Sequence, residues 1–299
     1  MGPITVSAAA AQFLEYAAAV VAPSTVALYR LYLTRLCAAF GTRELSSLTP
    51  AEVRTWGVSF HPLQAAQRLT RWAFLEARLV DRDPLAGLKK GATGRRLRTL
   101  SPEETARLAR QSHAHLRHFV IALRETIARP HELRQVTWAQ VYTAGLRPFT
   151  ADDLAAGRAF FFLDTFKGQS RRRDRTAVRV IPISPRLGRM LVRLRRAGPE
   201  LRACVFENCR RRPWTINAVR CSFRRLRVRA GLGVDHRGEN VVAYTLRHSS
   251  ATAAVVRGVP LAELAGAMGH SDVRMTSRYV HLSPAFLAQV HARIRNRRK

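Results

Sequence analysis

The stretch Tyr244-Thr-Leu-Arg247-His248-Ser-Ser-Ala-Thr252 is the most informative segment of this 299-residue sequence. It lies in a part of the chain whose apolar spacing predicts helices from Pro185 onward. Two more polar positions follow it in order: His270, directly after Gly269, and then Tyr279. Arginine supplies a permanent charge, histidine a hydrogen-bond donor and tyrosine a nucleophilic hydroxyl. Together these residue types can bind a phosphate group and attack it without a metal ion.

The composition around this segment is strongly basic. Lys and Arg number 51 against 20 Asp and Glu, which gives a formal net charge of +31. A field of this sign attracts polyanions, so nucleic acid is the expected partner. The basic residues are spread over the whole chain and no long apolar run is present, which disfavours binding to a membrane. Hydrophobic residues make up 47%, enough for a packed core.

The cysteines and the N-terminal segment narrow the class of protein further. The four cysteines form no Cys-x-x-Cys pair, and no histidine spacing completes a zinc site, so we expect neither a metal nor another cofactor. The Ala-rich start contains Gln12 and Glu15, which makes it a poor signal peptide. We therefore expect a cytoplasmic protein that associates with the nucleoid.

Apolar spacing and turn signals divide the chain into two domains joined by a linker. Residues 1–85 predict a helical bundle, in which Thr49-Pro50-Ala51-Glu52 has the form of a capping box and a fourth helix runs roughly from Leu63 to Leu79. Residues 86–100 are rich in glycine and basic residues, which indicates a flexible, positive linker. The second domain, residues 101–299, begins at another capping box, Ser101-Pro102-Glu103-Glu104.

The second domain is predicted to be mainly helical with a small β-sheet. Helices are expected to about Gln111 and from about His115 to Ala128. Phe160–Leu163 and Val178–Ile181 have the composition of strands, and the polar, basic turn from Gly168 to Arg175 joins them as a hairpin. The fold class is therefore mainly α, with an α+β second domain that follows an N-terminal helical bundle.

Attack on a phosphodiester requires fixed positive charge, because the charge of the phosphate repels nucleophiles and its leaving alkoxide is poor. Arginine suits this task, since it stays charged and offers a planar fork of donors. Arg129 and Arg247 both follow apolar helical runs, with Glu132 and His248 beside them. This placement favours partly buried, oriented side chains over ordinary surface arginines.

Four short motifs, taken in order, resemble those of the tyrosine recombinases, the phage integrase family. Thr126-Ile-Ala-Arg129-Pro-His-Glu132-Leu133 resembles the first arginine box, and Leu246-Arg247-His248-Ser-Ser-Ala-Thr252 resembles the second. Met268-Gly269-His270-Ser271 resembles the Leu-Gly-His-Ser motif, and Tyr279 stands nine residues after His270, the usual spacing of the nucleophile. Lys167 matches the position of the family's β-hairpin lysine. The resemblance covers residues 101 to about 290, and the N-terminal bundle resembles the family's SAM-like core-binding domain.

This resemblance implies a role for each residue. Tyr279 would attack the scissile phosphate and form a 3′-phosphotyrosyl bond, while Lys167 would protonate the leaving 5′-oxygen. Arg129 and Arg247 would neutralise the non-bridging oxygens, and His270 would donate a further hydrogen bond. Such an enzyme needs no metal or nucleotide. It acts on double-stranded DNA through a Holliday junction, as a homotetramer on paired sites that is a monomer or dimer when free.

One position departs from the family pattern. The second arginine box normally reads His-x-x-Arg, whereas this chain has Tyr244-Thr-Leu-Arg247. A tyrosine can hydrogen-bond a phosphate, but with an ordinary pKa of about 10 it is a poor base at neutral pH. Tyr244 therefore either orients the phosphate in an active enzyme or marks slower chemistry. His248, the next position after Arg247, is expected to face elsewhere and to be structural.

Basic residues outside the motifs are candidates for contacts with DNA phosphates: Lys89, Lys90, Arg95, Arg96, Arg171, Arg172 and Arg173. Each neutralised phosphate releases counterions, so binding should fall steeply with salt. The leading hypothesis is a site-specific DNA recombinase. The alternatives are a catalytically impaired member that only binds DNA, a relaxing enzyme with type IB topoisomerase chemistry, and a basic RNA-binding protein.

Overall fold

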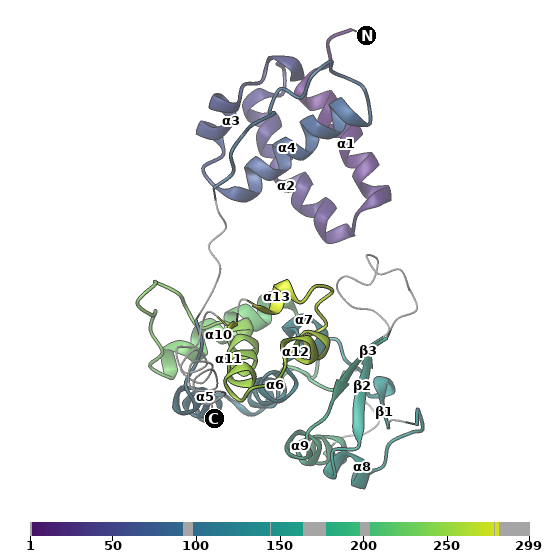
Figure 1. Ribbon diagram of the computed structural model, residues 1–299, viewed down its shortest axis with the longest axis vertical. Coiled ribbons are helices and arrows are strands. Elements are labelled where there is room, and N and C mark those ends of the chain that lie inside the picture. The colour runs from purple at the N-terminus through teal and green to yellow at the C-terminus, as the bar shows by residue number, and fades with distance from the viewer. Residues whose placement is uncertain are drawn as a thin grey trace, which may run out of the picture. The chain divides into compact units, whose positions relative to one another are not determined.

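The computed structural model describes residues 2–91, 98–143, 145–163, 178–197, 204–277 and 279–280. The chain divides into two compact units, Met1–Arg95 and Arg96–Lys299, each with its own hydrophobic core (Figure 1). Leu88 belongs to the core of the first unit and Leu100 to the core of the second. Several sequence predictions fall outside the described residues: the turn from Gly168 to Arg175, Lys167, Arg95, Arg96, and Arg171, Arg172 and Arg173.

The helices and strands follow one another in a mainly helical order. The first unit contains α1 (Val6–Val20), α2 (Pro23–Phe40), η1 (Leu45–Ser47), α3 (Pro50–Trp56) and α4 (Phe60–Leu75). The second unit begins with α5 (Pro102–Gln111), α6 (Ala114–Thr126), α7 (Pro130–Leu133), η2 (Trp138–Gln140), β1 (Val141–Thr143), α8 (Ala151–Ala155), β2 (Ala159–Leu163) and β3 (Arg179–Pro182). It continues with α9 (Pro185–Arg196), α10 (Ile216–Arg229), α11 (Ala243–Val256), α12 (Leu261–Met268) and α13 (Arg274–Ser277).

Helices α1, α2 and α4 pack around the apolar core of the first unit. The ring of Phe13 lies 5.3 Å from that of Tyr29 and 5.5 Å from that of Trp72, between centroids. Helix α3 begins with the predicted capping box. The Thr49 hydroxyl accepts a hydrogen bond from the Glu52 N–H, and the Glu52 carboxylate accepts one from the Thr49 N–H. The sequence signal for this helix start is confirmed.

Helix α4 starts and ends earlier than the sequence predicts, at Phe60 and Leu75. Its start coincides with Ser59 at the N-cap and Pro62 in the first turn, both ordinary signals for a helix start. Its end follows from Arg78, which takes the left-handed conformation with φ +55°. The chain then turns back, and the N–H of the residue after Arg78 bonds to a carbonyl in the last helical turn.

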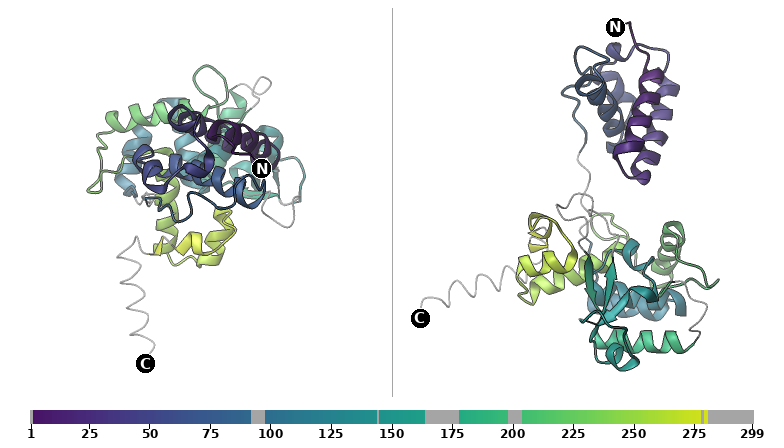
Figure 2. Two further views of the ribbon diagram at one scale, coloured as in Figure 1. Left: turned by 90° about the horizontal axis from the view of Figure 1, so that it is seen from above. Right: turned by 90° about the vertical axis from the view of Figure 1, so that its right-hand side faces the viewer.

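The strands of the second unit form one antiparallel sheet in the order β1-β2-β3. Phe161 lies opposite Ile181, and both are buried; Leu163 lies opposite Arg179. The predicted pairing of two strands in this region is confirmed. Strand β1 was not predicted, because three residues are too few for the alternation of a strand to be recognised. Figures 1 and 2 show the sheet at one side of the unit, with α8 and α9 beside it.

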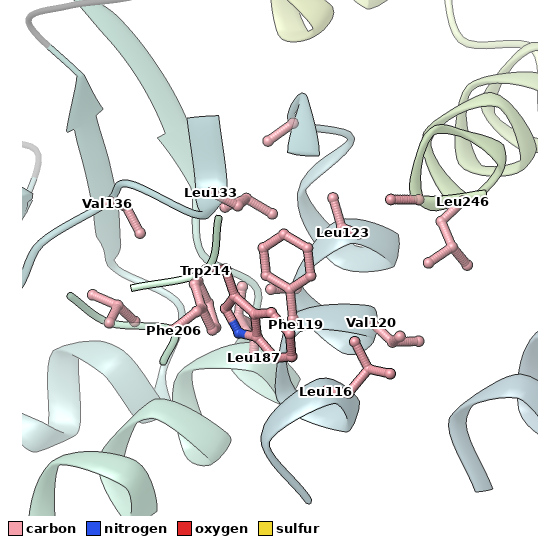
Figure 3. Close-up of a cluster of buried hydrophobic side chains, with 14 of the residues drawn as sticks. Leu116, Phe119, Val120, Leu123, Leu133, Val136, Leu187, Phe206, Trp214 and Leu246 are labelled. Atoms are coloured by element: carbon pink, nitrogen blue, oxygen red, sulfur yellow. The ribbon is translucent and has the colours of Figure 1, made fainter. Parts of the chain in front are cut away.

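The core of the second unit connects this sheet to the helices (Figure 3). Phe119 of α6 packs edge-on against Phe206 and stacks on Trp214, with 6.1 Å between ring centroids in both pairs. Leu246 of α11 belongs to the same cluster, so the residue directly before Arg247 is anchored in the core. The fold class is as predicted, mainly α with a small β-sheet. Within the described residues, no helix combines the length and apolar character needed to cross a bilayer.

Candidate active site

Helix α11 packs against α6 and α12 and carries Arg247, of which 2% is exposed (Figure 1). One guanidinium nitrogen, Nη1, donates to the carbonyl of Ile127, just after the end of α6. The other, Nη2, donates to the carbonyl of Met268 at 2.8 Å and lies 3.3 Å from His270 Nε2. Arg247 therefore joins the ends of two helices, and these bonds fix the orientation of its guanidinium group.

Arg129 stands at the N-cap of the short helix α7 and is 8% exposed. Pro130 follows it at the first helical position, where a missing N–H is tolerated. The Glu132 carboxylate accepts the Arg129 N–H at 2.8 Å and the Arg129 Nη1 donor at 2.7 Å. One acidic side chain therefore caps the helix and orients the arginine.

Arg179 of β3 is a third buried arginine at the same place, and sequence analysis did not identify it. Its Nε lies 3.3 Å from Glu132 Oε1, and its Nη2 donates to the Ala267 carbonyl at 3.1 Å. The sequence signal that could have found it is strand alternation, because Arg179 shares the inward face of β3 with Ile181. An arginine at an inward strand position needs a polar partner, and Glu132 is that partner.

The guanidinium groups of the three arginines meet at the end of helix α12. The carbonyls of Ala267, Met268 and Gly269 accept hydrogen bonds from Arg179, Arg247 and Arg129, the last at 2.9 Å. The last carbonyls of a helix have no partner within the helix and carry the negative end of its dipole. Three consecutive carbonyls, two from the last residues of α12 and one from its C-cap, thus hold guanidinium groups that come from β3, from α11 and from the N-cap of α7.

Gly269 and His270 turn the chain away from α12. Gly269 is the C-cap, with φ +64°, a conformation that favours glycine. A Cβ at this position would lie 1.9 Å from Arg179 Nη1, so glycine also makes room for that side chain. His270 Nδ1 lies 2.8 Å from the hydroxyl oxygen of buried Thr276, and its Nε2 faces Arg247.

Ile127 carries backbone strain next to the site. It takes the left-handed conformation with φ +52° at the end of α6. A β-branched residue rarely adopts this conformation, which typically costs on the order of 1–3 kcal/mol. Its carbonyl accepts the bond from Arg247, and Arg129 follows two residues later. The turn that presents Arg129 beside Arg247 is therefore held by surrounding contacts against its local preference.

Tyr279 lies just after α13 and is 2% exposed, packed in a small apolar cluster with residues of α11 and α12 that include Ala251, Leu264 and Met268. Its hydroxyl oxygen lies 3.0 Å from His248 Nδ1, with 5.7 Å between the two ring centroids. The expectation that His248 faces elsewhere is wrong. Tyr279 reaches it from a segment outside α11, and no spacing within that helix predicts such a contact.

Tyr244 stands one helical turn before His248 and is 38% exposed. Its ring centroid lies 6.1 Å from that of His248. Partial burial raises the pKa of the Tyr244 hydroxyl, and the nearby positive charges of Arg247 and Arg129 oppose this shift without cancelling it. Tyr244 is therefore a neutral hydrogen-bonding group at ordinary pH.

The site carries more positive than negative charge. Burial, together with the neighbouring Arg129, lowers the pKa of Arg247 to about 10. For Glu132, burial opposes ionisation, but the charges of Arg179 and Arg129 outweigh it and the pKa falls below its usual range. Arg129 and Arg179 contact this carboxylate, and Arg247 interacts with its charge, so the three guanidinium groups and the one carboxylate carry a formal excess of two positive charges. A buried excess of this kind favours an anion.

The structure brings several of the predicted site residues together in the second unit, and two of the predicted DNA-contacting lysines belong to the first unit. Arg129, Arg247 and His270 form one bonded group, and Tyr279 contacts the same helix through His248. Lys89 and Lys90 are exposed in the first unit, where Lys90 Nζ lies 5.6 Å from the Phe60 ring centroid. Among the described residues, no three His, Cys, Asp or Glu side chains are grouped as metal ligands would be.

Comparison with solved structures supports the fold. A lambda integrase dimer bound to a COC′ core site matches with a TM-score of 0.70 and 17% identity, over 93% of this chain and 77% of that chain. The Tn1549 transposon integrase in complex with transposon right end DNA matches with a TM-score of 0.70 and 16% identity, over 98% and 99%. A lambda integrase tetramer bound to a Holliday junction matches with a TM-score of 0.72 and 15% identity, over 93% and 78%.

Sequence comparison gives the family. No curated protein matches this chain at a significant level. The model of the phage integrase family matches residues 98–285, which contain the three arginines of the site, His270 and Tyr279. This match covers more than half of the chain and every element that builds the site. The chain belongs to the phage integrase family, the tyrosine recombinases.

Proposed function

We propose that this protein is a site-specific tyrosine recombinase that cleaves and rejoins duplex DNA through a 3′-phosphotyrosyl intermediate. The observation that carries the proposal is the group of buried arginines around the end of α12, with Tyr279 on the neighbouring segment. A phosphodiester carries one negative charge, and attack by a tyrosine oxygen gives a transition state with two. The formal excess of two positive charges in the site therefore suits the transition state better than the ground state.

In this proposal each polar residue has one task. Arg129 and Arg247 stabilise the non-bridging oxygens, which gain charge as the Tyr279 oxygen adds to phosphorus. His270, held by Thr276 through Nδ1, presents Nε2 as a further donor to the same phosphate. Lys167, which lies outside the described residues, protonates the leaving 5′-oxygen. Tyr244 donates a hydrogen bond to the phosphate and is not a base.

Rejoining is the reverse of cleavage. The phosphotyrosyl bond keeps the energy of the broken DNA bond, so a 5′-hydroxyl from a partner strand can attack it without ATP. Exchange of strands between two sites then gives a Holliday junction. We propose a tetramer on paired sites and a monomer or dimer when free. The similarity to a lambda integrase tetramer bound to a Holliday junction supports this assembly.

The first unit and the linker are proposed to contact DNA in addition to the catalytic domain. In this view residues 1–85 form a core-binding domain, residues 86–100 a basic linker and residues 101–299 the catalytic domain. Lys89 and Lys90 are exposed and suited to phosphate contacts. Arg95, Arg96 and Arg171–Arg173 are proposed for the same role from sequence alone. The net charge of +31 supports binding that weakens steeply with salt.

Covalent trapping tests the proposal. Wild-type protein, Tyr279→Phe and the control Tyr29→Phe, whose tyrosine lies in the first unit, are mixed with nicked suicide duplexes from DNA that flanks the coding sequence. Denaturing gels should show a protease-sensitive shifted band for the wild type and for Tyr29→Phe only. All three proteins should bind the duplex equally. A band that persists in Tyr279→Phe contradicts the assignment of the nucleophile.

The identity of residue 244 keeps one second candidate open, a member that binds DNA with impaired chemistry. Tight, salt-sensitive binding without a covalent band in the wild type favours it, particularly if Tyr244→His restores the band. Relaxation of supercoiled DNA by a monomer, without sequence preference, favours type IB topoisomerase chemistry instead. Binding to RNA but not to duplex DNA favours the RNA-binding alternative.

A further inference from the structure

We propose that His248 accepts the proton of the Tyr279 hydroxyl when Tyr279 attacks the phosphate. This inference rests on the proposed function and adds a residue to it. Its main support is the distance of 3.0 Å between His248 Nδ1 and the Tyr279 hydroxyl oxygen. A general base must lie within about 2.6–3.2 Å of the atom whose proton it takes, and His248 meets this requirement.

The place of His248 on α11 explains why it can take this role. The position that usually carries histidine in the second arginine box holds Tyr244 here. Tyr244 has a raised pKa and its hydroxyl is a poor proton acceptor. His248 stands one helical turn further along the same helix, so it lies on nearly the same side as Tyr244. The ring contacts agree, because His248 lies 6.1 Å from Tyr244 and 5.7 Å from Tyr279 between centroids.

The surroundings of Tyr279 require a polar partner for its hydroxyl. The ring is buried among apolar side chains of α11 and α12, where direct ionisation of a phenol would be costly. Arg247 is adjacent to His248 in the sequence, and negative charge on Tyr279 acts to raise the pKa of Arg247. Among the described residues, the titratable and charged groups near His248 include Tyr244 and Arg247 on its own helix and Tyr279 on the segment after α13. Arg129 and Glu132 act on Tyr244 from α7.

The Tyr279 O–H proton moves to His248 Nδ1, which must be in the tautomer that carries hydrogen on Nε2. The freed electron pair of the Tyr279 oxygen forms the bond to phosphorus. The bond between phosphorus and the 5′-oxygen breaks, and this oxygen takes a proton from the acid, for which Lys167 is proposed. In rejoining, the 5′-hydroxyl gives its proton back to the residue proposed as the acid while its oxygen bonds to phosphorus. The bond between phosphorus and the Tyr279 oxygen breaks, and the His248 imidazolium returns its proton to that oxygen.

Proton transfer in this step must accompany bond formation. A phenol ordinarily has a pKa of about 10 and an imidazole about 6.5, so complete transfer before attack would be unfavourable by about 5 kcal/mol. As the oxygen bonds to phosphorus its acidity rises, and the imidazole then becomes the stronger base. General base catalysis of this kind typically contributes about 10²- to 10⁴-fold to the rate.

Two substitutions of His248 distinguish a histidine that acts as a base from one that only positions Tyr279. The amide of His248→Asn can hydrogen-bond the tyrosine hydroxyl from a place near that of Nδ1, but it cannot accept a proton. His248→Phe removes the hydrogen bond as well. His236→Asn, at an exposed loop histidine, is the matched control. Single-turnover cleavage of the suicide duplex should fall about 10²-fold or more in both His248 variants and stay unchanged in the control.

The pH profile gives a readout that a structural role would not move. Wild-type cleavage should rise with pH as an imidazole loses its proton, ordinarily near pH 6.5. In His248→Asn this rise should disappear, and cleavage should recover only toward the pKa of a free phenol, about 10. Loss of activity at all pH values to the same extent, with the imidazole limb retained, overturns the proposal.

The outcomes distinguish this inference from the proposed function. If the wild type gives no covalent band, both are overturned. If the wild type cleaves and His248→Asn cleaves equally well, only the role of His248 is overturned. Faster cleavage by His248→Asn also overturns it and identifies the contact as a latch that restrains Tyr279. Thermal unfolding and duplex binding of each variant, expected to match the wild type, exclude loss of folding as the cause.

Discussion

Two ion pairs of nearly equal length lie in different surroundings in the two units. Arg43 and Glu52 of the first unit are 2.8 Å apart, with 37% and 40% of their side chains exposed. Arg129 and Glu132 of the second unit are 2.7 Å apart, with 10% and 1% exposed. The first pair is an ordinary surface contact beside an apolar core. The second is part of a buried group that also contains Arg179 and Arg247.

This difference separates stability from function. An exposed pair contributes little, since water and salt screen it. Burial of charge costs several kcal/mol per ion, and replacement by apolar residues often stabilises a fold. The site in the second unit nevertheless keeps Arg129, Arg179 and Arg247 buried with the single carboxylate of Glu132. An arrangement that is unfavourable for folding alone is what we expect of a site that binds an anion, as we propose for the DNA phosphate. Substitutions in the buried group, each with a matched control elsewhere, can therefore test its role.

The largest expected effect is on stability, from Glu132→Gln. It leaves Arg129 and Arg179 without their common carboxylate, which should lower the free energy of unfolding of the second unit by about 3–5 kcal/mol. The matched variant Glu52→Gln should change the first unit by only a small fraction of this. Hydrogen exchange in denaturant resolves the two units. Equal losses of unfolding free energy in Glu132→Gln and Glu52→Gln would contradict the different roles inferred for the buried and the exposed pair.

The second effect is on the rate of cleavage, from Arg247→Lys. Lysine keeps the charge but cannot donate to the carbonyls of Ile127 and Met268 with a planar fork. Cleavage should fall about 10²- to 10³-fold while duplex binding changes little. The control Arg257→Lys, at the exposed end of the same helix, should leave both unchanged. A matching loss of binding would indicate an arginine that only contacts DNA.

A smaller effect is expected from Gly269→Ala. The new methyl group would collide with Arg179, and a left-handed alanine is strained by about 1–2 kcal/mol. The Gly269 carbonyl that holds Arg129 should shift, and cleavage should fall about tenfold. Gly266→Ala is the control three residues earlier, because nothing lies within 4 Å of its Cβ. It should cleave normally, and a loss at both glycines would point to α12 as a whole.

The smallest effect is the pH dependence of the Glu132 contribution. Its pKa in the folded state lies below the ordinary value of about 4.3, so its contribution to stability is complete above that pH and is lost as pH falls toward the lowered pKa. The difference in unfolding free energy between wild type and Glu132→Gln should therefore shrink below about pH 4. A difference that stays constant down to pH 3 would show that the ionised carboxylate is not its source.

The sequence predicts most of the architecture and the motifs of the site, but not its internal contacts. Both capping boxes and the pairing of β2 with β3 followed from local rules. Arg179 was missed because a charged residue in a short strand usually faces water, and the groups that make its burial tolerable, Glu132 and the Ala267 carbonyl, lie far away in the chain. The contact between His248 and Tyr279 was missed because it depends on the path of the chain after α12.

The use of three backbone carbonyls at the end of α12 has a consequence for experiments that search for functional residues. Ala267, Met268 and Gly269 hold the arginines through oxygens that every amino acid carries. Side-chain replacement cannot remove them, and Ala267 is exposed, so a scan would report it as silent. A backbone ester in place of the next peptide bond would weaken the carbonyl as an acceptor and reveal it. Part of this site is therefore determined by the path of the backbone at the end of α12 and not by the identity of the side chains there.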